Sequence, residues 1–173
     1  MYIVENAYLQ FIRNNHEFLT LTALEQHIGI PFQSLHKFIK TGDFPEKHLP
    51  LVQAKLEPLI HAQLVWQTTI VYARQMVREY QEQVRIVREN PGDSKKSLPA
   101  NARQEQITDD LTRLYLLARN SGLPYVEKME KVLTEGIPML QRIVAMARES
   151  SGPLSLDDIR KLPLNGEINA QPC

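Results

Sequence analysis

Apolar side chains recur at helical spacing along most of this chain, and no stretch alternates apolar and polar residues as a half-buried strand does. The clearest pattern lies within residues 61–89, where seven positions are separated alternately by four and three residues. These positions, called the seam below, are Trp66, Ile70, Ala73, Val77, Tyr80, Val84 and Val87. Such heptad spacing is typical of a helix packed lengthwise against another helix. The sequence therefore predicts an all-α protein with a long central helix over 61–90.

Glycine, proline and polar clusters divide the rest of the chain. Residues 1–60 are predicted to form an N-terminal domain, and the polar stretch 91–103 is predicted to be a linker. Apolar stripes beyond it predict a C-terminal helical hairpin over 104–150. Residues 151–173 hold further glycines and prolines, and we expect a partly ordered tail there.

Two short helices joined by a glycine turn are predicted within residues 21–42. Thr22 followed three residues later by Glu25 has the spacing of a capping box, which marks the start of a helix. Gly29 suits the left-handed backbone that ends a helix, and Pro31 suits the first turn of the next one. This arrangement is a helix-turn-helix pattern.

Residues 19–60 resemble the Cro and phage-repressor class of helix-turn-helix domains. The resemblance is carried, in order, by a small residue, Leu-Glu, Ile-Gly-Ile, Ser-Leu, Phe-Ile-Lys and Gly, followed by Pro-Glu-Lys-His-Leu-Pro. In that class the second helix enters the major groove of DNA, N-terminal end first. The resemblance therefore implies that helix 32–40 reads duplex DNA in a regulatory role. The residues implied to contact DNA are Phe32, Gln33, Ser34, His36, Lys37, Lys40 and Thr22.

Each of these side chains has a chemistry that suits a contact with DNA. Gln33 can make a paired hydrogen bond to adenine, and Lys37 can reach a guanine edge or a phosphate. Phe32 can touch a thymine methyl group. Ser34, Lys40 and Thr22 suit phosphate contacts, which position a protein without reading sequence.

The balance of charged residues favours DNA binding by several copies over tight binding by one. The whole chain balances 20 Lys and Arg against 20 Asp and Glu, and residues 1–60 hold five cations against six anions. Because non-specific DNA affinity comes largely from neutralising phosphates, this balance argues against tight binding by a single copy. The reading helix itself is basic. Since helix-turn-helix proteins usually read two half-sites with two copies, we expect a homo-oligomer joined through the seam of helix 61–89. The same spacing also fits a bundle within one chain.

Other function classes find less support. The chain has one cysteine, Cys173, so an internal disulfide and a cysteine-based zinc site are excluded. No combination of nucleophile, base and orienting group is visible, so we expect no enzyme and predict no cofactor and no metal site. No apolar stretch is long enough to span a membrane, and no signal-peptide pattern is present, so we expect a cytoplasmic protein. Two alternatives stay open: a phage-type DNA-packaging (similar to small terminase subunits) or replication-recruitment protein, and a helical protein-interaction module without nucleic acid.

Overall fold

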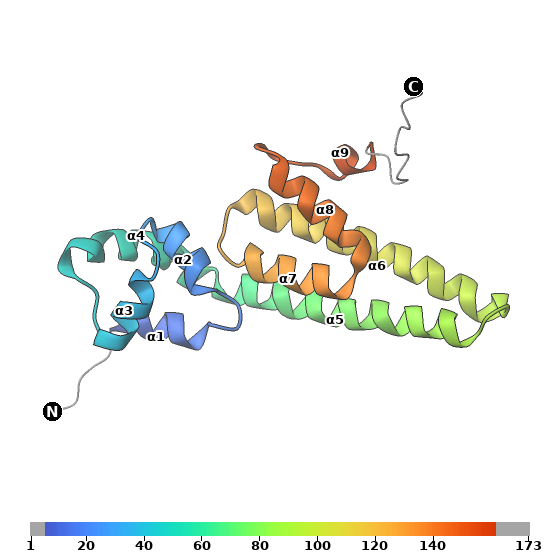
Figure 1. The fold of residues 1–173 in the computed structure, drawn as a ribbon, viewed down its shortest axis with the longest axis horizontal. Helices are drawn as coiled ribbons and strands as arrows, with labels where there is room; N and C mark the ends of the chain where they lie inside the picture. Colours follow the sequence, from blue (N-terminus) through green and yellow to red (C-terminus); the bar gives the residue numbers. More distant parts are fainter. Residues whose placement is uncertain (1–5, 162–173) are drawn as a thin grey trace, which may run out of the picture.

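The computed structural model describes residues 6–161, and all regular structure in that range is helical, as predicted (Figure 1). An N-terminal unit, α1 to α4, lies at one end of an elongated molecule, and a long hairpin of α5 and α6 extends away from it (Figure 1). The helices are α1 (Ala7–Asn14), α2 (Leu21–Ile28), α3 (Ser34–Thr41), the 3-10 helix η1 (Glu46–His48), α4 (Leu49–His61), α5 (Gln63–Glu89), α6 (Ser94–Ser121), α7 (Val126–Gly136), α8 (Pro138–Glu149) and α9 (Leu156–Arg160).

The N-terminal unit is held together by apolar side chains from each of its main helices. Leu24 of α2, Leu35 of α3 and Leu56 of α4 have no solvent exposure. The pairs in contact are α2 with α3, α2 with α4, and α1 with α4. Removing this apolar surface from water is the main stabilising force available to so small a unit.

The hairpin carries the rest of the fold. A tight turn over residues 90–93 reverses the chain, and the carboxylate of Asp93 accepts the backbone N–H of Lys95 at 3.1 Å, which caps α6. α7 packs on α5, and α8 packs on α7. A Cβ atom at Gly136, the last residue of α7, would overlap Cγ1 of Val77. α7 therefore approaches α5 this closely only because residue 136 has no side chain.

Trp66 anchors the junction between the N-terminal unit and the hairpin. It is 1% exposed, and its ring meets Phe11 and Phe18 edge-on at centroid distances of 6.3 and 5.9 Å. Next to it, the buried Oδ1 atom of Asn15 accepts a hydrogen bond from Nε2 of Gln67 at 2.6 Å. Apolar and polar contacts thus both connect the two parts of the molecule.

The prediction of a linker over 91–103 is wrong, because α6 already begins at Ser94. Pro99 lies inside the second turn of α6, where it removes one backbone hydrogen bond and its ring crowds the carbonyl of Lys95. The cap at the helix start satisfies N–H groups there, and Ala100 is buried against the rest of the fold. The polar composition of residues 94–103 does not prevent a helix, because one face of this segment packs against the rest of the fold.

The C-terminal hairpin predicted over 104–150 also differs from the structure. That range holds most of α6 and then α7 and α8, and the long hairpin is formed by α5 with α6. The predicted tail 151–173 contains α9, whose start carries a capping box between Ser155 and Asp158. Residues after 161, including Cys173, lie outside the described residues.

The seam of α5 is covered mainly by the same chain. Trp66, Ile70, Ala73 and Val77 are buried, with α6 and α7 as the neighbours of α5. Tyr80 and Val87 are half-buried, and Val84 is 37% exposed. The prediction that the seam joins two copies is therefore wrong for its first four positions. Periodicity shows that a helix face is buried without showing what covers it.

Candidate nucleic-acid interface

α2 and α3 meet at a tight turn that follows the predicted glycine. Gly29 has φ +84° and ends α2, and Gly42 has φ +80° and ends α3, both as predicted. Both glycines adopt the left-handed backbone that other residues rarely adopt. α3 begins at Ser34, later than the predicted start at Phe32, because residues 31–33 form the turn itself.

The buried carboxylate of Glu25, which the sequence predicted to cap the start of its own helix, holds the turn between α2 and α3 in place. Glu25 is 3% exposed, and its two oxygens accept the backbone N–H groups of Gln33 at 3.1 Å and Leu35 at 3.0 Å. The predicted capping box between Thr22 and Glu25 is therefore wrong. Glu25 on α2 satisfies amide groups at the start of α3 and so holds the two helices in one geometry.

The true cap of α2 is Thr20, whose Oγ1 accepts the backbone N–H of Ala23 at 3.1 Å. Thr22 is left exposed in the first turn of α2. Gln33 has φ +64°, and it is the one non-glycine residue with a positive φ in the part of the chain that the structure describes. Such a backbone costs free energy and persists where surrounding contacts enforce it, as the bond from Gln33 to Glu25 does here.

α3 presents a basic face to solvent. His36, Lys37 and Lys40 are all exposed. At 100° per residue they fall within about a third of the helix circumference. The opposite side carries Leu35, which is fully buried, and the half-buried Phe38. α3 contains no Asp or Glu, so no carboxylate of its own neutralises this face.

The remaining residues that the sequence pointed to lie around the start of α3. Phe32 is 71% exposed, Gln33 is exposed and Ser34 is half-buried. At the other end of α3, Arg13 of α1 donates from Nη2 to the carbonyl oxygen of Ile39 at 2.9 Å. The sequence alone does not place Arg13 at this surface, because only the packing of α1 brings it beside α3.

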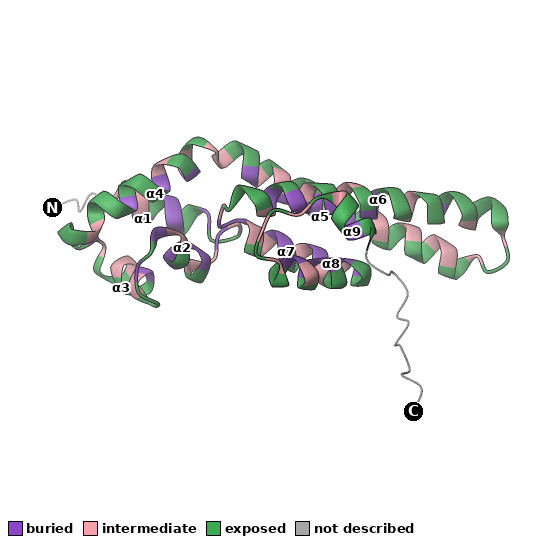
Figure 2. Ribbon diagram, turned by 90° about the horizontal axis from the view of Figure 1, so that it is seen from above, coloured by how far each residue is buried: buried purple, intermediate pink, exposed green. Residues whose placement is uncertain are grey.

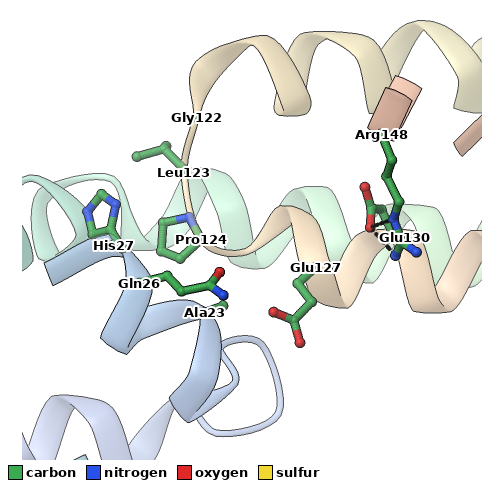
Figure 3. Close-up of a pocket in the computed structure, with 9 residues that line it drawn as sticks. All are labelled: Ala23, Gln26, His27, Gly122, Leu123, Pro124, Glu127, Glu130 and Arg148. Atoms are coloured by element: carbon green, nitrogen blue, oxygen red, sulfur yellow. Dashed lines mark hydrogen bonds and ion pairs between the residues drawn. The ribbon is translucent and has the colours of Figure 1, made fainter. Parts of the chain in front are cut away.

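A polar groove of about 640 Å³ lies between α2 and the connection from α6 to α7 (Figure 3). Gln26 of α2 and Glu127 of α7 face it from opposite sides (Figure 3). At one end, the carboxylate of Glu130 accepts the hydroxyl of Tyr115 at 2.8 Å and Nη2 of Arg148 at 2.6 Å. Burial, and then the bond to Glu130, raise the pKa of Tyr115. Both oxygens of Glu130 are thus already paired, and the cluster connects α6, α7 and α8.

Among residues 6–161, no group of three His, Cys, Asp or Glu side chains is placed to hold a metal ion. None of the helices in that range is long and apolar enough to cross a membrane. Comparisons with protein-family models, with curated proteins and with solved structures found no match for this chain.

Proposed function

We propose that this protein binds duplex DNA through the exposed face of α3, in a regulatory role. The observation that carries the proposal is the basic face of His36, Lys37 and Lys40 on a short helix without any carboxylate. The hydrogen bonds from Gln33 and Leu35 to Glu25 fix α3 against α2, so the basic side chains of α3 are already positioned in the protein without DNA. A helix with a cationic outer face fits the major groove in width and in charge.

The start of α3 is the end that would read bases. Gln33 and Phe32 lie there and are exposed, so an adenine contact by the amide and a thymine-methyl contact by the ring are both within their chemistry. Lys37 lies one turn further along α3 and suits guanine or phosphate. Ser34, Lys40 and Thr22 suit phosphates, which set the orientation of the protein on the duplex.

Two of the six carboxylates counted within residues 1–60 have hydrogen-bond partners inside the fold. Glu25 is buried beneath the start of α3, whose amide groups offset its charge. Glu57 of α4 accepts the hydroxyl of Tyr8 at 2.8 Å, away from α3 in the sequence and on another helix. A hydrogen bond from a neutral hydroxyl leaves the charge of Glu57 in place, so the count of five cations against six anions over residues 1–60 still applies. We expect salt-sensitive binding of modest affinity for a single copy.

The open alternative of a protein-interaction module would need an apolar outer face around Phe32. Phe32 is 71% exposed, but Gln33, His36 and Lys37 follow it, and no second large apolar side chain on α3 is exposed. This composition favours a polyanion over an apolar partner.

The test is fluorescence anisotropy with a labelled mixed-sequence duplex over a salt series. The Lys37→Ala/Lys40→Ala variant is compared with Lys95→Ala/Lys96→Ala, which removes the same charge at the far end of the hairpin (Figure 1). If each α3 lysine neutralises one phosphate, the first variant lowers the slope of log affinity against log salt by about 2. The second variant leaves that slope unchanged.

Two results would overturn the proposal. One is the absence of binding at low salt by protein whose circular dichroism shows a folded helical chain. The other is an equal loss of affinity in both double variants, because a diffuse charge effect would then explain the binding without α3. Gln33→Ala, assayed on duplexes recovered by site selection, separates base reading from phosphate contact. A base-reading role predicts a loss for the selected site and little change for mixed sequence.

A further inference from the structure

The hairpin has an exposed apolar surface on the side away from its core. On α5, Leu64, Val65, Val71 and Tyr72 are 78%, 69%, 52% and 42% exposed. Leu117 of α6 is 71% exposed. We call these five side chains the outer face. Single exposed apolar residues are common on protein surfaces, whereas a contiguous group of them marks an interaction site.

The pairing of α5 with α6 brings Leu117, which also borders a groove with Leu154 and Leu156, to the level of the α5 side chains of the outer face. Nε of Arg103 donates to Glu79 at 2.6 Å and fixes the register of the two antiparallel helices. Leu117 lies fourteen residues after Arg103 on α6, and Val65 lies fourteen residues before Glu79 on α5, which is about four helical turns in each case. Because the two helices are antiparallel, Leu117 and Val65 lie level with one another. α7 and α8 cover the hairpin on one side, and no described helix lies over its other side (Figure 2).

The part of the outer face on α5 also lacks charge. No Asp, Glu, Lys or Arg occurs from Ala62 to Ala73, and charged residues resume at Arg74. A solvated helix surface normally carries charged residues, and the centres of protein interfaces are depleted of them. The absence of charge therefore fits a surface that is covered by another apolar surface.

We propose that the outer face binds a second copy of this chain, with the two α5 helices antiparallel about a two-fold axis through Thr68. Leu64 and Tyr72 each lie four residues from Thr68, and Val65 and Val71 each lie three residues from it. The axis places Leu64 against the second copy's Tyr72, and Val65 against the second copy's Val71. A two-fold interface must match itself in this way, because both copies contribute the same surface.

The outer face supplies most, but not all, of the apolar area that an ordinary dimer interface buries. At about 100 Å² of apolar area for each fully exposed side chain of this size, the five side chains present on the order of 300 Å² per copy. A stable interface of ordinary size buries about 800 Å² per partner, of which somewhat over half is apolar. Polar neighbours at the edge, such as Gln75 and His61, supply further area. The formal net charge of zero also removes long-range repulsion between copies.

This dimer uses the opposite side of α5 from the buried seam, and it does not depend on DNA binding. Its first test is sedimentation velocity of the full chain at about 1 to 100 μM, which detects dissociation constants up to about that range. We expect a species of twice 19.9 kDa. Leu64→Glu/Val71→Glu should weaken dimerisation at least 100-fold, while Leu98→Glu/Met139→Glu, at sites 65% and 51% exposed outside the outer face, should not.

The second test probes the axis itself. Thr68→Cys in a Cys173→Ser background places one thiol on the two-fold axis. Helices packed at 8–10 Å bring facing Cα atoms to about 4–5 Å, which a disulfide can span. We expect rapid oxidation to a covalent dimer, and no such product from Gln141→Cys on the exposed side of α8.

Several outcomes would overturn the proposal. The first is a wild-type chain that stays monomeric at about 100 μM, above which only weak contacts remain. The second is a ring or larger oligomer. The third is a dimer that the Leu64→Glu/Val71→Glu variant still forms. A closed two-fold pair has no room for a third copy, so a larger oligomer contradicts it. Failure of Thr68→Cys to cross-link faster than the control, in a chain that is dimeric, would overturn the axis. Circular dichroism establishes that each variant is folded.

Discussion

Replacing Glu25 tests how α3 is held. Its carboxylate accepts two backbone N–H groups, from Gln33 and Leu35, and it is 3% exposed. A hydrogen bond to a charged group contributes about 1.5–3 kcal/mol, and an amide left buried without a partner costs a similar amount. Glu25→Ala removes both bonds, although water reaches part of the turn. We therefore expect a loss of about 2–4 kcal/mol in the free energy of unfolding.

Glu25→Gln is the sharper variant, because it keeps the shape of the side chain. One amide oxygen still accepts a hydrogen bond, but the NH₂ group now faces a backbone donor, so about half of the loss should remain, roughly 1–2 kcal/mol. The assay is urea unfolding followed by circular dichroism and by the fluorescence of Trp66, the single tryptophan, which is buried at the junction. Gln26→Ala, exposed on the same helix, is the control.

The reasoning is refuted if Glu25→Ala lies within about 0.5 kcal/mol of the wild type, the usual scatter of surface substitutions. It is also refuted if the amide protons of Gln33 and Leu35 exchange with solvent as fast in the wild type as in Glu25→Ala. If α3 binds DNA, both variants should also weaken that binding, because a loosened helix must be ordered at a cost in affinity.

Two further predictions concern packing and pH. Gly136→Ala places a methyl group into Cγ1 of Val77 and should destabilise the fold by about 1–3 kcal/mol, despite the better helix propensity of alanine. In a Val77→Ala background the same change should cost at least about 1 kcal/mol less. Equal costs in both backgrounds would contradict the contact. Burial lowers the pKa of His27 below its ordinary value of 6.5, although a contact with the carbonyl of Lys55 partly opposes this. As the pH falls, the unfolded chain therefore takes up the proton first, and the stability of the fold should fall below about pH 6.5. His27→Gln should flatten this part of the pH dependence in urea titrations, and an unchanged slope would assign it to other groups.

Local signals in the sequence predict the structure where a single residue sets the backbone. Gly29 and Gly42 end their helices in the left-handed conformation, because glycine has no Cβ to oppose it. The spacing of the seam identified the buried side of α5, since Trp66, Ile70 and Ala73 are at most 1% exposed. Helical periodicity needs only the geometry of one helix, which the order of residues already contains.

Partners across the fold were decided by the tertiary structure. The sequence contains Glu25 three residues after Thr22, and only the approach of α3 shows that its carboxylate caps the next helix. The polar segment before Pro99 became helix because α5 lies beside it. The first four seam residues are covered by the N-terminal unit, α6 and α7 of the same chain, which leaves the uncharged stretch around Thr68 as the exposed apolar side of α5. A burial pattern fixes which side of a helix avoids water, whereas the identity of the covering surface depends on contacts between residues far apart in the chain.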